Sequence, residues 1–473
     1  MFYQNQQTKT DPNVNNLTVH DAVELFTRAQ VALAEIESNG IRIDVQRLGA
    51  NIKHAYSIAD EAAKKCLIDP VGQKWLQLFP QPNLQNRNEL AEVLFSKNGF
   101  GYECTAKTAT GKPKVDKEIL ERMPQIRDFV YYYLEYQSLL KAIVGNMEGL
   151  YKVLDPNGFI HPSFGLLGVS TYRTNCSSPN IQQIPNRNQQ LHDIIRSVYV
   201  ANSPTAHFVE VDYDGSEVRC NASINHDPTL VKSITEGLDF HKWVAAESYL
   251  MPQEEVTKKL RTSVKGKYTF AAFYGSFWKS IAEALWDNIA YDETLKTAHG
   301  VPLKEWIASK GITCLGDPNS PKDGTYYAHI KNVDKRFWGE LFPVYDQWKK
   351  DLFKKYLKEG HVDAPTGFRS AGIMSSRLTS NMPAQASSAH LTLRAMTGIH
   401  FEMKALGMRS QITGEIHDSI LASVEADELD AYRKLARKWM CEITPRYNPW
   451  LRVPLDCKFA VAPVGGSWAD TVE

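Results

Sequence analysis

The stretch FVEVDYDGSEVR, residues 208–219, decides how this chain is interpreted, because an apolar strand runs directly into a group of charges. The alternation in residues 208–211 predicts a strand that is buried in a core. Two carboxylates, Asp212 and Asp214, follow at its end, and Glu217 comes soon after. Like charges held so close together are costly unless cations or solvent neutralise them. The end of this strand is therefore a candidate cation site.

The composition bounds the class of protein. With 473 residues the chain is long enough for two or more lobes with sizeable cores. Its 43% hydrophobic and 23% charged residues are typical of a soluble globular protein. No apolar run reaches membrane-spanning length, the N-terminus lacks the apolar core of a signal peptide, and the seven cysteines suggest neither a disulfide framework nor a zinc module. We expect a reduced, cytoplasmic protein with no membrane partner.

Charge is balanced overall but uneven along the chain. Lysine plus arginine and aspartate plus glutamate number 54 each, so net charge alone indicates no polyanionic partner. Residues 258–268 carry five cations and no acid, and residues 348–358 are also basic. Either run alone is more typical of a solvated helix face. Nucleic-acid-binding proteins can nevertheless combine balanced totals with positive charge concentrated in one groove.

The pattern of apolar residues divides the chain into regions. Residues 158–220 and 360–473 mix strands with helices, whereas helical spacing dominates residues 228–360. No internal repeat is present. These regions predict an α+β protein in which one sheet-containing lobe surrounds a helical insertion.

A second acidic strand end lies far along the sequence. Residues 410–424, SQITGEIHDSILASV, predict a strand–turn–strand with His417 and Asp418 at its tip. A His-Asp pair in a hairpin is by itself more often a turn than a metal site. Together with Asp212, however, Asp418 could converge on one sheet and hold two divalent cations, as phosphoryl-transfer enzymes require. Oxygen ligands of this kind favour magnesium.

Between these strands, residues 261–276 combine cations and aromatic rings at helical spacing. Arg261 and Lys265 are four residues apart, and so are Phe270 and Tyr274, so each pair shares a helix face. Such a helix suits a triphosphate at one end and a base at the other. An amphipathic helix with an aromatic core stripe is the plainer alternative.

Together these segments resemble the three motifs of family A DNA polymerases, the group of bacterial DNA polymerase I and many phage replicases. Residues 212–219 resemble the first motif, D-Y-S-Q-I-E-L-R, residues 416–419 the V-H-D-E hairpin, and residues 261–275 the helix motif R-x3-K-x3-F/Y-x3-Y-G. Further matches occur in the family's order at residues 36–44, 170–187, 239–242, 377–385 and 453–470. The resemblance covers the chain from about residue 30 to its end and points to the phage type.

The resemblance implies a right-hand polymerase with a thumb, a palm built on an antiparallel sheet, and fingers. The implied domains are an N-terminal extension at 1–29, a thumb at 30–150, a palm at 151–227 and 360–473, and fingers at 228–359. The thumb-like segment starts too early to leave room for a proofreading exonuclease lobe before it. We therefore expect polymerisation without 3′–5′ excision.

The implied reaction is template-directed DNA synthesis, in which a monomer transfers nucleotides from dNTPs to the primer 3′-OH of primer-template DNA with two Mg²⁺ per active site. The implied metal ligands are Asp212, the backbone carbonyl of Tyr213, and Asp418. The implied nucleotide contacts are Glu217, His241, Arg261, Lys265, Phe270 and Tyr274, with Lys265 also a candidate acid for the leaving group. The implied DNA contacts are Arg173, Arg377, Asn381, Gln385 and His417.

Three departures separate this chain from the family pattern. Residues 214–216, Asp-Gly-Ser, replace S-Q-I and add a carboxylate beside the metal site, and Ser419 replaces the usual glutamate. The helix motif also has one residue too many between Lys265 and Phe270. A π-bulge could absorb the extra residue, Lys267 could take over the phosphate contact, or Thr269 and Phe273 could face the nucleotide instead. We expect the bulge, with Phe270 and Tyr274 in place.

Two other functions compete with this interpretation. Single-subunit RNA polymerases share the palm and have D-G-S and H-D-S in their motifs, as residues 214–216 and 417–419 do here. Glu217 favours DNA, because DNA-making relatives place a bulky glutamate where a ribose 2′-hydroxyl would lie. A non-catalytic nucleic-acid-binding protein would explain the basic runs but not the two strand-end aspartates.

Overall fold

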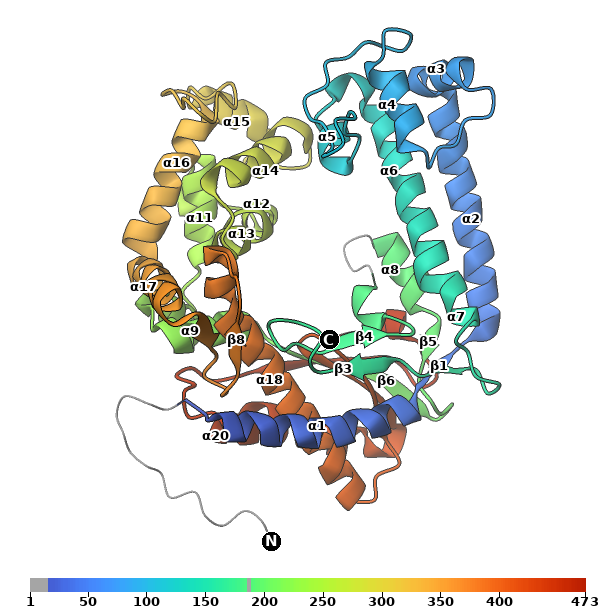
Figure 1. The fold of residues 1–473 in the computed structure, drawn as a ribbon, viewed down its shortest axis with the longest axis vertical. Coiled ribbons are helices and arrows are strands. Elements are labelled where there is room, and N and C mark those ends of the chain that lie inside the picture. Colours follow the sequence, from blue (N-terminus) through green and yellow to red (C-terminus); the bar gives the residue numbers. More distant parts are fainter. Residues whose placement is uncertain (1–15, 185–188) are drawn as a thin grey trace.

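The computed structural model describes residues 16–184 and 189–473 as a base from which two helical lobes rise (Figure 1). Residues 1–15 of the expected N-terminal extension, and the part of the matched segment 170–187 from residue 185 onward, lie outside the described residues. Within the described ranges, no helix is both long enough and apolar enough to cross a membrane. All seven cysteines are free.

The centre of the base is a four-stranded antiparallel sheet in the order β11-β6-β10-β9. Its strands are β6 (Ala206–Tyr213), β9 (Gln411–Ile416), β10 (Ser419–Glu425) and β11 (Cys457–Val461). Strands β9 and β10 confirm the strand–turn–strand expected over residues 410–424. The neighbouring β6 confirms the strand expected before Asp212, because residues 206, 208, 209 and 211 are fully buried.

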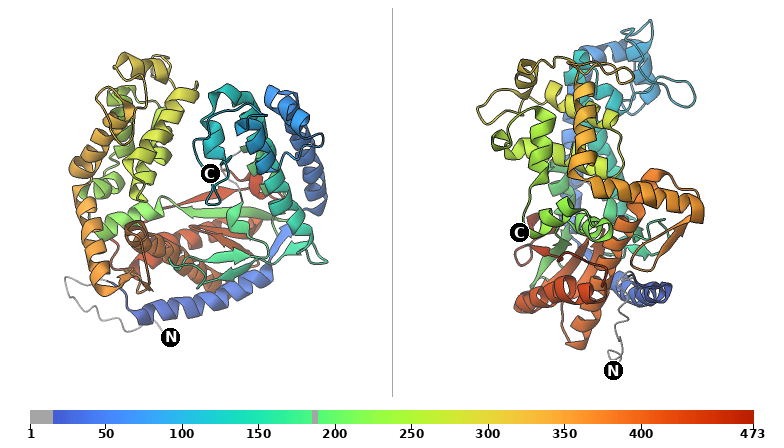
Figure 2. Two further views of the ribbon diagram at one scale, coloured as in Figure 1. Left: turned by 45° about the horizontal axis from the view of Figure 1, so that its top comes forward. Right: turned by 90° about the vertical axis from the view of Figure 1, so that its left-hand side faces the viewer.

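Long helices cover the base. The helices of the base are α1 (Val19–Asn39), α9 (Ser216–Asn225), α18 (Ser376–Ala405), α19 (Leu429–Arg437) and α20 (Thr444–Arg446). Helix α1 packs against α18 and β9, on the side of the base away from the two lobes (Figures 1 and 2). The boundary expected at residue 30 therefore falls inside one continuous helix, whose buried alanines and leucines join the core of the base.

The first lobe is built from residues that follow α1. Its helices are α2 (Val45–Ile68), α3 (Pro70–Leu78), α4 (Arg87–Phe95), α5 (Lys117–Glu121), η1 (Pro124–Ile126), α6 (Arg127–Ala142), the π-helical η2 (Ile143–Glu148) and α7 (Gly149–Tyr151). The antiparallel pair α2 and α6 forms its stem. The upper part of the lobe has a hydrophobic core of its own, centred on Trp75 and Phe129.

The second lobe contains residues 228–359 and is entirely helical apart from isolated bridges. Its helices are α10 (Pro228–Thr235), α11 (Phe240–Tyr249), η4 (Gln253–Glu255), α12 (Lys258–Val264), η5 (Lys265–Phe270), α13 (Ala271–Phe273), α14 (Trp278–Tyr291), α15 (Leu303–Ser309), α16 (Tyr326–Arg336), η6 (Phe337–Leu341) and α17 (Pro343–Glu359). A separate aromatic-rich core holds them together. This confirms the helical character expected for residues 228–360.

Short elements complete the base. The remaining ones are β1 (Ile41–Ile43), β2 (Phe159–Ile160), β3 (Ser163–Gly165), β4 (Asn175–Ser177), η3 (Ile181–Gln183), α8 (Gln189–Arg196), β5 (Tyr199–Val200), β7 (His361–Asp363), β8 (Arg369–Ala371), η7 (Ala426–Glu428), η8 (Lys438–Ile443) and η9 (Trp468–Asp470). The strands form one sheet in the order β2-β1-β5 and the hairpins β3-β4 and β7-β8. The α+β fold class expected from the sequence is confirmed.

Candidate active site

The two strand-end aspartates meet because β6 and β10 are antiparallel neighbours. Their register pairs Asp212 with Ser419, the residue after Asp418. The backbone N–H of Tyr213 also donates to the carbonyl of Asp418, at 3.3 Å. Asp212, Tyr213 and Asp418 are therefore brought together, although more than 200 residues separate the aspartates in the chain.

The environment of this pair suits a divalent cation. Burial raises the pKa of Asp212 to about 7, and the negative charges of Asp418 and Glu210 push it in the same direction. A cation bound between the carboxylates would remove this penalty, and the donors available are all oxygens. Within the described residues no three acidic, histidine or cysteine side chains gather into a metal site, so the candidate donors are two carboxylates and the Tyr213 carbonyl.

Serine hydroxyls contact both aspartates. The chain leaves β6 through Gly215, whose φ of 65° lies in the left-handed region that glycine adopts without strain. Helix α9 then begins at Ser216, whose Oγ donates to Asp418 Oδ2 at 3.0 Å and lies 2.7 Å from Ser388 Oγ. Ser419 Oγ donates to Asp212 Oδ1 at 3.4 Å. In the sequence, Ser216 and Ser419 were noticed only because they depart from the family motifs. Nothing in the sequence indicated that Ser388 lies near the aspartates.

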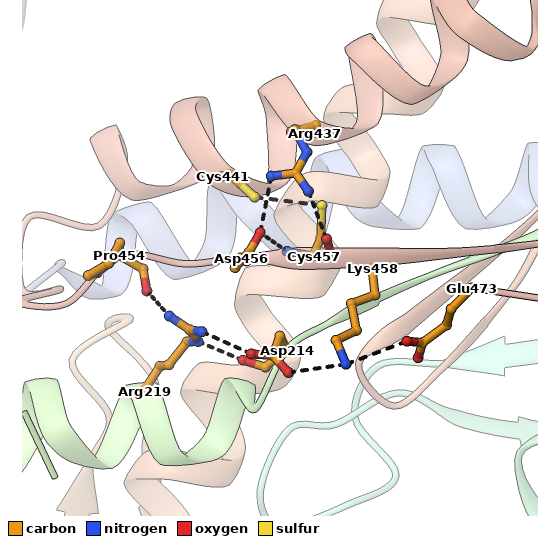
Figure 3. Close-up of polar contacts among 9 residues, drawn as sticks. All are labelled: Asp214, Arg219, Arg437, Cys441, Pro454, Asp456, Cys457, Lys458 and Glu473. Carbon is orange, nitrogen blue, oxygen red and sulfur yellow. Dashed lines mark hydrogen bonds and ion pairs between the residues drawn. The ribbon is translucent and has the colours of Figure 1, made fainter. Parts of the chain in front are cut away.

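The additional carboxylate, Asp214, is neutralised by cations (Figure 3). Arg219 donates to Asp214 Oδ2 at 3.1 Å and to its backbone oxygen at 2.6 Å. Lys458, on β11, lies 3.8 Å from Asp214 Oδ1 and 3.6 Å from Glu473. Asp214 thus ties the end of β6 to the C-terminal strand, and Arg219 accounts for part of the charge that follows Asp212.

A second group of contacts fastens β11 to the helices behind it. Arg437, at the end of α19, donates to Asp456 Oδ1 and to the carbonyl of Cys457, each at 3.0 Å. The thiols of Cys441 and Cys457 are 3.6 Å apart (Figure 3). These contacts hold the edge strand in register beside Asp212.

The extra residue of the helix motif is absorbed as expected. Residues Lys265–Phe270 form a π-helical turn, η5, between α12 and α13. Lys267 points toward α14, where its Nζ donates to Asn288 and, at 3.1 Å, to the carbonyl of Ala284. Thr269 is fully buried. The π-bulge is confirmed. Phe273 is also buried, and the contacts of Phe270 and Tyr274 with the nucleotide stay a prediction.

Three expected phosphate contacts lie together in the second lobe. Burial, together with the positive charges of Arg261 and Lys265, lowers the pKa of His241 to about 4. His241 Nδ1 is 3.2 Å from the hydroxyl of Thr269. Arg261 Nε donates to Asp239 at 2.7 Å. Within the described residues Lys265 is exposed and pairs with no acid, and its Nζ lies 5.5 Å from the Phe270 ring centre.

Glu217 is held by two donors, in a pocket shared with other expected contacts. The Tyr274 hydroxyl donates to one carboxylate oxygen and Arg173 to the other. Asn381 donates to the Tyr274 carbonyl at 3.1 Å. The pocket is lined by Glu217, Phe270, Tyr274, Asn381 and Gln385, among others. Glu217 therefore does not pair with Arg219, which bonds to Asp214 instead.

The last two expected DNA contacts border this region. Arg377 is exposed at the start of α18, and its side chain packs against Gly275, directly after Tyr274. His417 is exposed at the tip of the β9–β10 hairpin with φ 61°, a conformation that non-glycine residues seldom adopt outside tight turns. It directly precedes Asp418 in the turn between β9 and β10.

Comparison with known proteins identifies relatives for nearly the whole chain. The model of DNA polymerase family A matches residues 61–299 and 355–470. DNA polymerase I of Bacillus subtilis (strain 168) is 25% identical over 471 residues, covering 98% of this chain and 48% of the relative. The thermostable DNA polymerase I of Thermus aquaticus is 24% identical over 455 residues, covering 93% of this chain and 47% of the relative.

A solved structure shares the fold. The POL domain of Pol1 from M. smegmatis, in complex with DNA primer-template and dNTP, matches with a TM-score of 0.74 at 23% identity, covering 94% of this chain and 70% of that chain. The chain spans about half the length of the curated relatives it matches. These matches are to bacterial polymerases and give no support to the phage type that the sequence suggested.

Proposed function

The chain belongs to DNA polymerase family A, and on that premise we propose that it catalyses template-directed DNA synthesis, transferring nucleotides from dNTPs to the 3′-OH of a primer. Its partners are primer-template DNA and dNTPs, and its place of action is the cytoplasm. The observation that carries this proposal is the meeting of Asp212 and Asp418 at adjacent ends of β6 and β10. The implied domains, with the thumb in the first lobe and the fingers in the second, are part of the proposal.

Asp212, Asp418 and the carbonyl of Tyr213 would hold two Mg²⁺ ions. When bound, magnesium supplies the Lewis acidity that activates the primer hydroxyl and stabilises the leaving pyrophosphate. The protein holds these donors on neighbouring strands of one sheet, so little rearrangement is needed to bring them to the reacting groups.

The second lobe would bind the nucleotide. Arg261 and Lys265 contact the triphosphate, His241 donates to it as a neutral imidazole, and Lys265 protonates the leaving group. Phe270 and Tyr274 pack against the base. Glu217, fixed by Tyr274 and Arg173, lies beneath the sugar, where a ribose 2′-hydroxyl would collide with it.

The DNA contacts complete the proposal. Arg173, Arg377, Asn381, Gln385 and His417 face the minor groove of the newly formed pairs. That groove offers acceptors that every correct base pair has in common, so contacts there test pair geometry and not sequence. The absence of 3′–5′ excision by this chain stays a prediction from the sequence.

Primer extension with single carboxylate substitutions tests the proposal. Asp212→Asn and Asp418→Asn should each reduce extension below about a tenth of the wild-type rate, because each removes a charged ligand from the same site. DNA binding, measured by fluorescence anisotropy, should remain close to that of the wild type.

Asp214→Asn is the matched control, since that carboxylate pairs with Arg219 and Lys458 instead. It should keep extension within about threefold of the wild type. Reactions with dNTPs and with rNTPs, each in magnesium and in EDTA, separate the three candidate functions. Efficient use of rNTPs by the wild type would favour an RNA polymerase, and DNA binding without any extension would favour a binding protein.

A further inference from the structure

Each aspartate of the candidate metal site is bonded by a serine that follows the other aspartate. Ser216, four residues after Asp212, donates to Asp418 Oδ2 at 3.0 Å. Ser419, directly after Asp418, donates to Asp212 Oδ1 at 3.4 Å. The two strand ends are thus joined by a crossed pair of hydroxyl–carboxylate bonds in addition to the backbone ladder.

The hydroxyls are buried, so water competes little for them. Ser216 is 1% exposed, Ser388 3% and Ser419 7%. A hydrogen bond to a charged group in such surroundings is stronger than its equivalent in water and restricts the rotation of the carboxylate. These serines therefore favour particular orientations of the two aspartates.

The chemistry of the donors gives the Ser388–Ser216–Asp418 chain a direction. Ser216 uses its single hydroxyl proton in the hydrogen bond to Asp418 Oδ2. Ser388 Oγ, 2.7 Å from Ser216 Oγ, must then donate to it. Ser388 on α18 thereby orients the Ser216 hydroxyl, which in turn orients Asp418.

We propose that Ser216 and Ser419 are positioning residues that hold Asp418 and Asp212 in the orientations that face the divalent cations, with Ser388 orienting Ser216. The inference rests on the proposed function of the aspartate pair. It assigns a role to two of the positions at which the chain departs from the family motifs, where serines replace an isoleucine and a glutamate.

The test measures metal affinity separately from turnover. Outer-shell partners of metal ligands typically contribute about 10–100-fold to affinity. Ser216→Ala should therefore raise the Mg²⁺ concentration for half-maximal primer extension about tenfold, while the rate at saturating Mg²⁺ stays within about threefold of the wild type. Ser419→Ala should shift the same concentration less, because its bond is longer.

A second readout does not depend on activity. Binding of Mn²⁺ is followed by the loss of the free-ion electron paramagnetic resonance signal, using protein, a dideoxy-terminated primer-template and the next dNTP. Ser216→Ala should weaken this binding about tenfold, and Ser388→Ala should weaken it by a smaller factor. If Ser216→Ala does not fold, Ser388→Ala, which leaves the Asp418 contact itself intact, carries the test alone.

Ser387→Ala is the matched control. Ser387 is on the same helix and fully buried, and within the described residues its hydroxyl has no hydrogen-bond partner. It should bind Mn²⁺ and respond to Mg²⁺ as the wild type does.

Suppose that the wild type extends primers and Asp418→Asn does not. The positioning role would then be overturned if Ser216→Ala and Ser388→Ala both depended on metal concentration as the wild type does. A wild type that fails to extend primers would instead overturn the proposed function.

Discussion

Glu217 is the residue on which we expect the choice between DNA and RNA synthesis to depend. Its two carboxylate oxygens accept from Tyr274 and from Arg173, so its side chain is held from the second lobe and from the base at once. A carboxylate fixed from both sides cannot readily move aside for an additional hydroxyl. The selectivity of the site should therefore reside in this one side chain.

Glu217→Ala should keep measurable dNTP incorporation and raise rNTP incorporation relative to dNTP by at least an order of magnitude, about 1.4 kcal/mol. The reason is that truncation opens the space beneath the sugar without touching Asp212 or Asp418. Single-nucleotide insertion assays with matched dNTP and rNTP measure the ratio. An unchanged ratio of rNTP to dNTP incorporation in Glu217→Ala would contradict the proposal that Glu217 excludes the ribose 2′-hydroxyl.

Glu415, on β9, is a buried acid for which the proposed chemistry has no role. Its side chain accepts from Thr174 and, at 3.3 Å, from Gln182, and it is 1% exposed. Burial raises its pKa to about 8; the Thr174 hydrogen bond opposes that shift, whereas the charge of Asp418 adds to it. Near neutral pH the folded protein thus holds a proton that the unfolded chain releases.

The stability of the fold should therefore fall as pH rises from the ordinary pKa of glutamate, near 4.5, through about 8. Glu415→Gln removes this titration but keeps the shape. The difference in thermal midpoint between Glu415→Gln and the wild type should increase by about 2 °C in favour of the variant as the pH is raised from about 5 to about 8.5. Glu254→Gln, at an exposed position, is the control and should follow the wild type throughout. If the difference in thermal midpoint between Glu415→Gln and the wild type stayed constant with pH, Glu415 would be ionised in the folded protein across this pH range.

At the scale of elements, the π-helical turn η5 sets which side chains of the second lobe face the site. A turn with one additional residue rotates the following helix relative to the preceding one. Lys267 therefore turns toward α14, whereas Phe270 lies beside Lys265, Glu217 and Tyr274. The family resemblance implies that a tyrosine at the position of Phe270 replaces the missing 3′-hydroxyl of a dideoxynucleotide.

Phe270→Tyr should increase the use of dideoxynucleotides relative to dNTPs by about tenfold, or about 1.4 kcal/mol, because it adds that hydroxyl at the site. Chain-termination ladders on one template measure the ratio. Thr269→Val is the comparison, since Thr269 is buried against His241 and should leave the ratio unchanged. If Thr269→Val changed the ratio and Phe270→Tyr did not, Thr269 and not Phe270 would face the nucleotide.

At the scale of the whole molecule, the two lobes touch at their tips (Figure 1). Arg122 lies 3.1 Å from Glu283, and Arg127 donates to the carbonyl of Tyr291 at 2.9 Å. Arg127 also lies 3.6 Å from Glu293, and a cavity of about 670 Å³ separates α6 from α14 nearby. Ion pairs that are this exposed contribute only about 0.2–1 kcal/mol each and are screened by salt.

Raising NaCl from about 0.05 M to about 0.5 M should therefore separate the tips and increase the radius of gyration measured by small-angle X-ray scattering. The double variant Arg122→Ala/Arg127→Ala should show the larger radius already at low salt. Arg336→Ala is the control, since Arg336 pairs with Glu247 and Glu340 inside the second lobe. A wild-type radius that does not respond to salt would mean that packing, and not charge, holds the tips together.

Local patterns in the sequence were enough to predict the elements of the site. The alternation before Asp212 and around residues 410–424 has the period of a strand, and the four-residue spacing of Arg261 and Lys265 has the period of a helix. Compared with the family motif, the extra residue between Lys265 and Phe270 also predicted the π-bulge. Such features depend on neighbours along the chain, so sequence alone determined the α+β class and the two strand-end aspartates, and its resemblance to known motifs indicated the family.

Only the tertiary structure decided which side chains meet. No local spacing relates Ser216 to Ser388, Asp214 to Lys458, or Arg173 to Glu217, because each pair comes from segments that the fold brings together from far apart in the chain. A hydrogen bond forms or fails over a fraction of an ångström, and only the packed arrangement of the whole chain sets distances that finely.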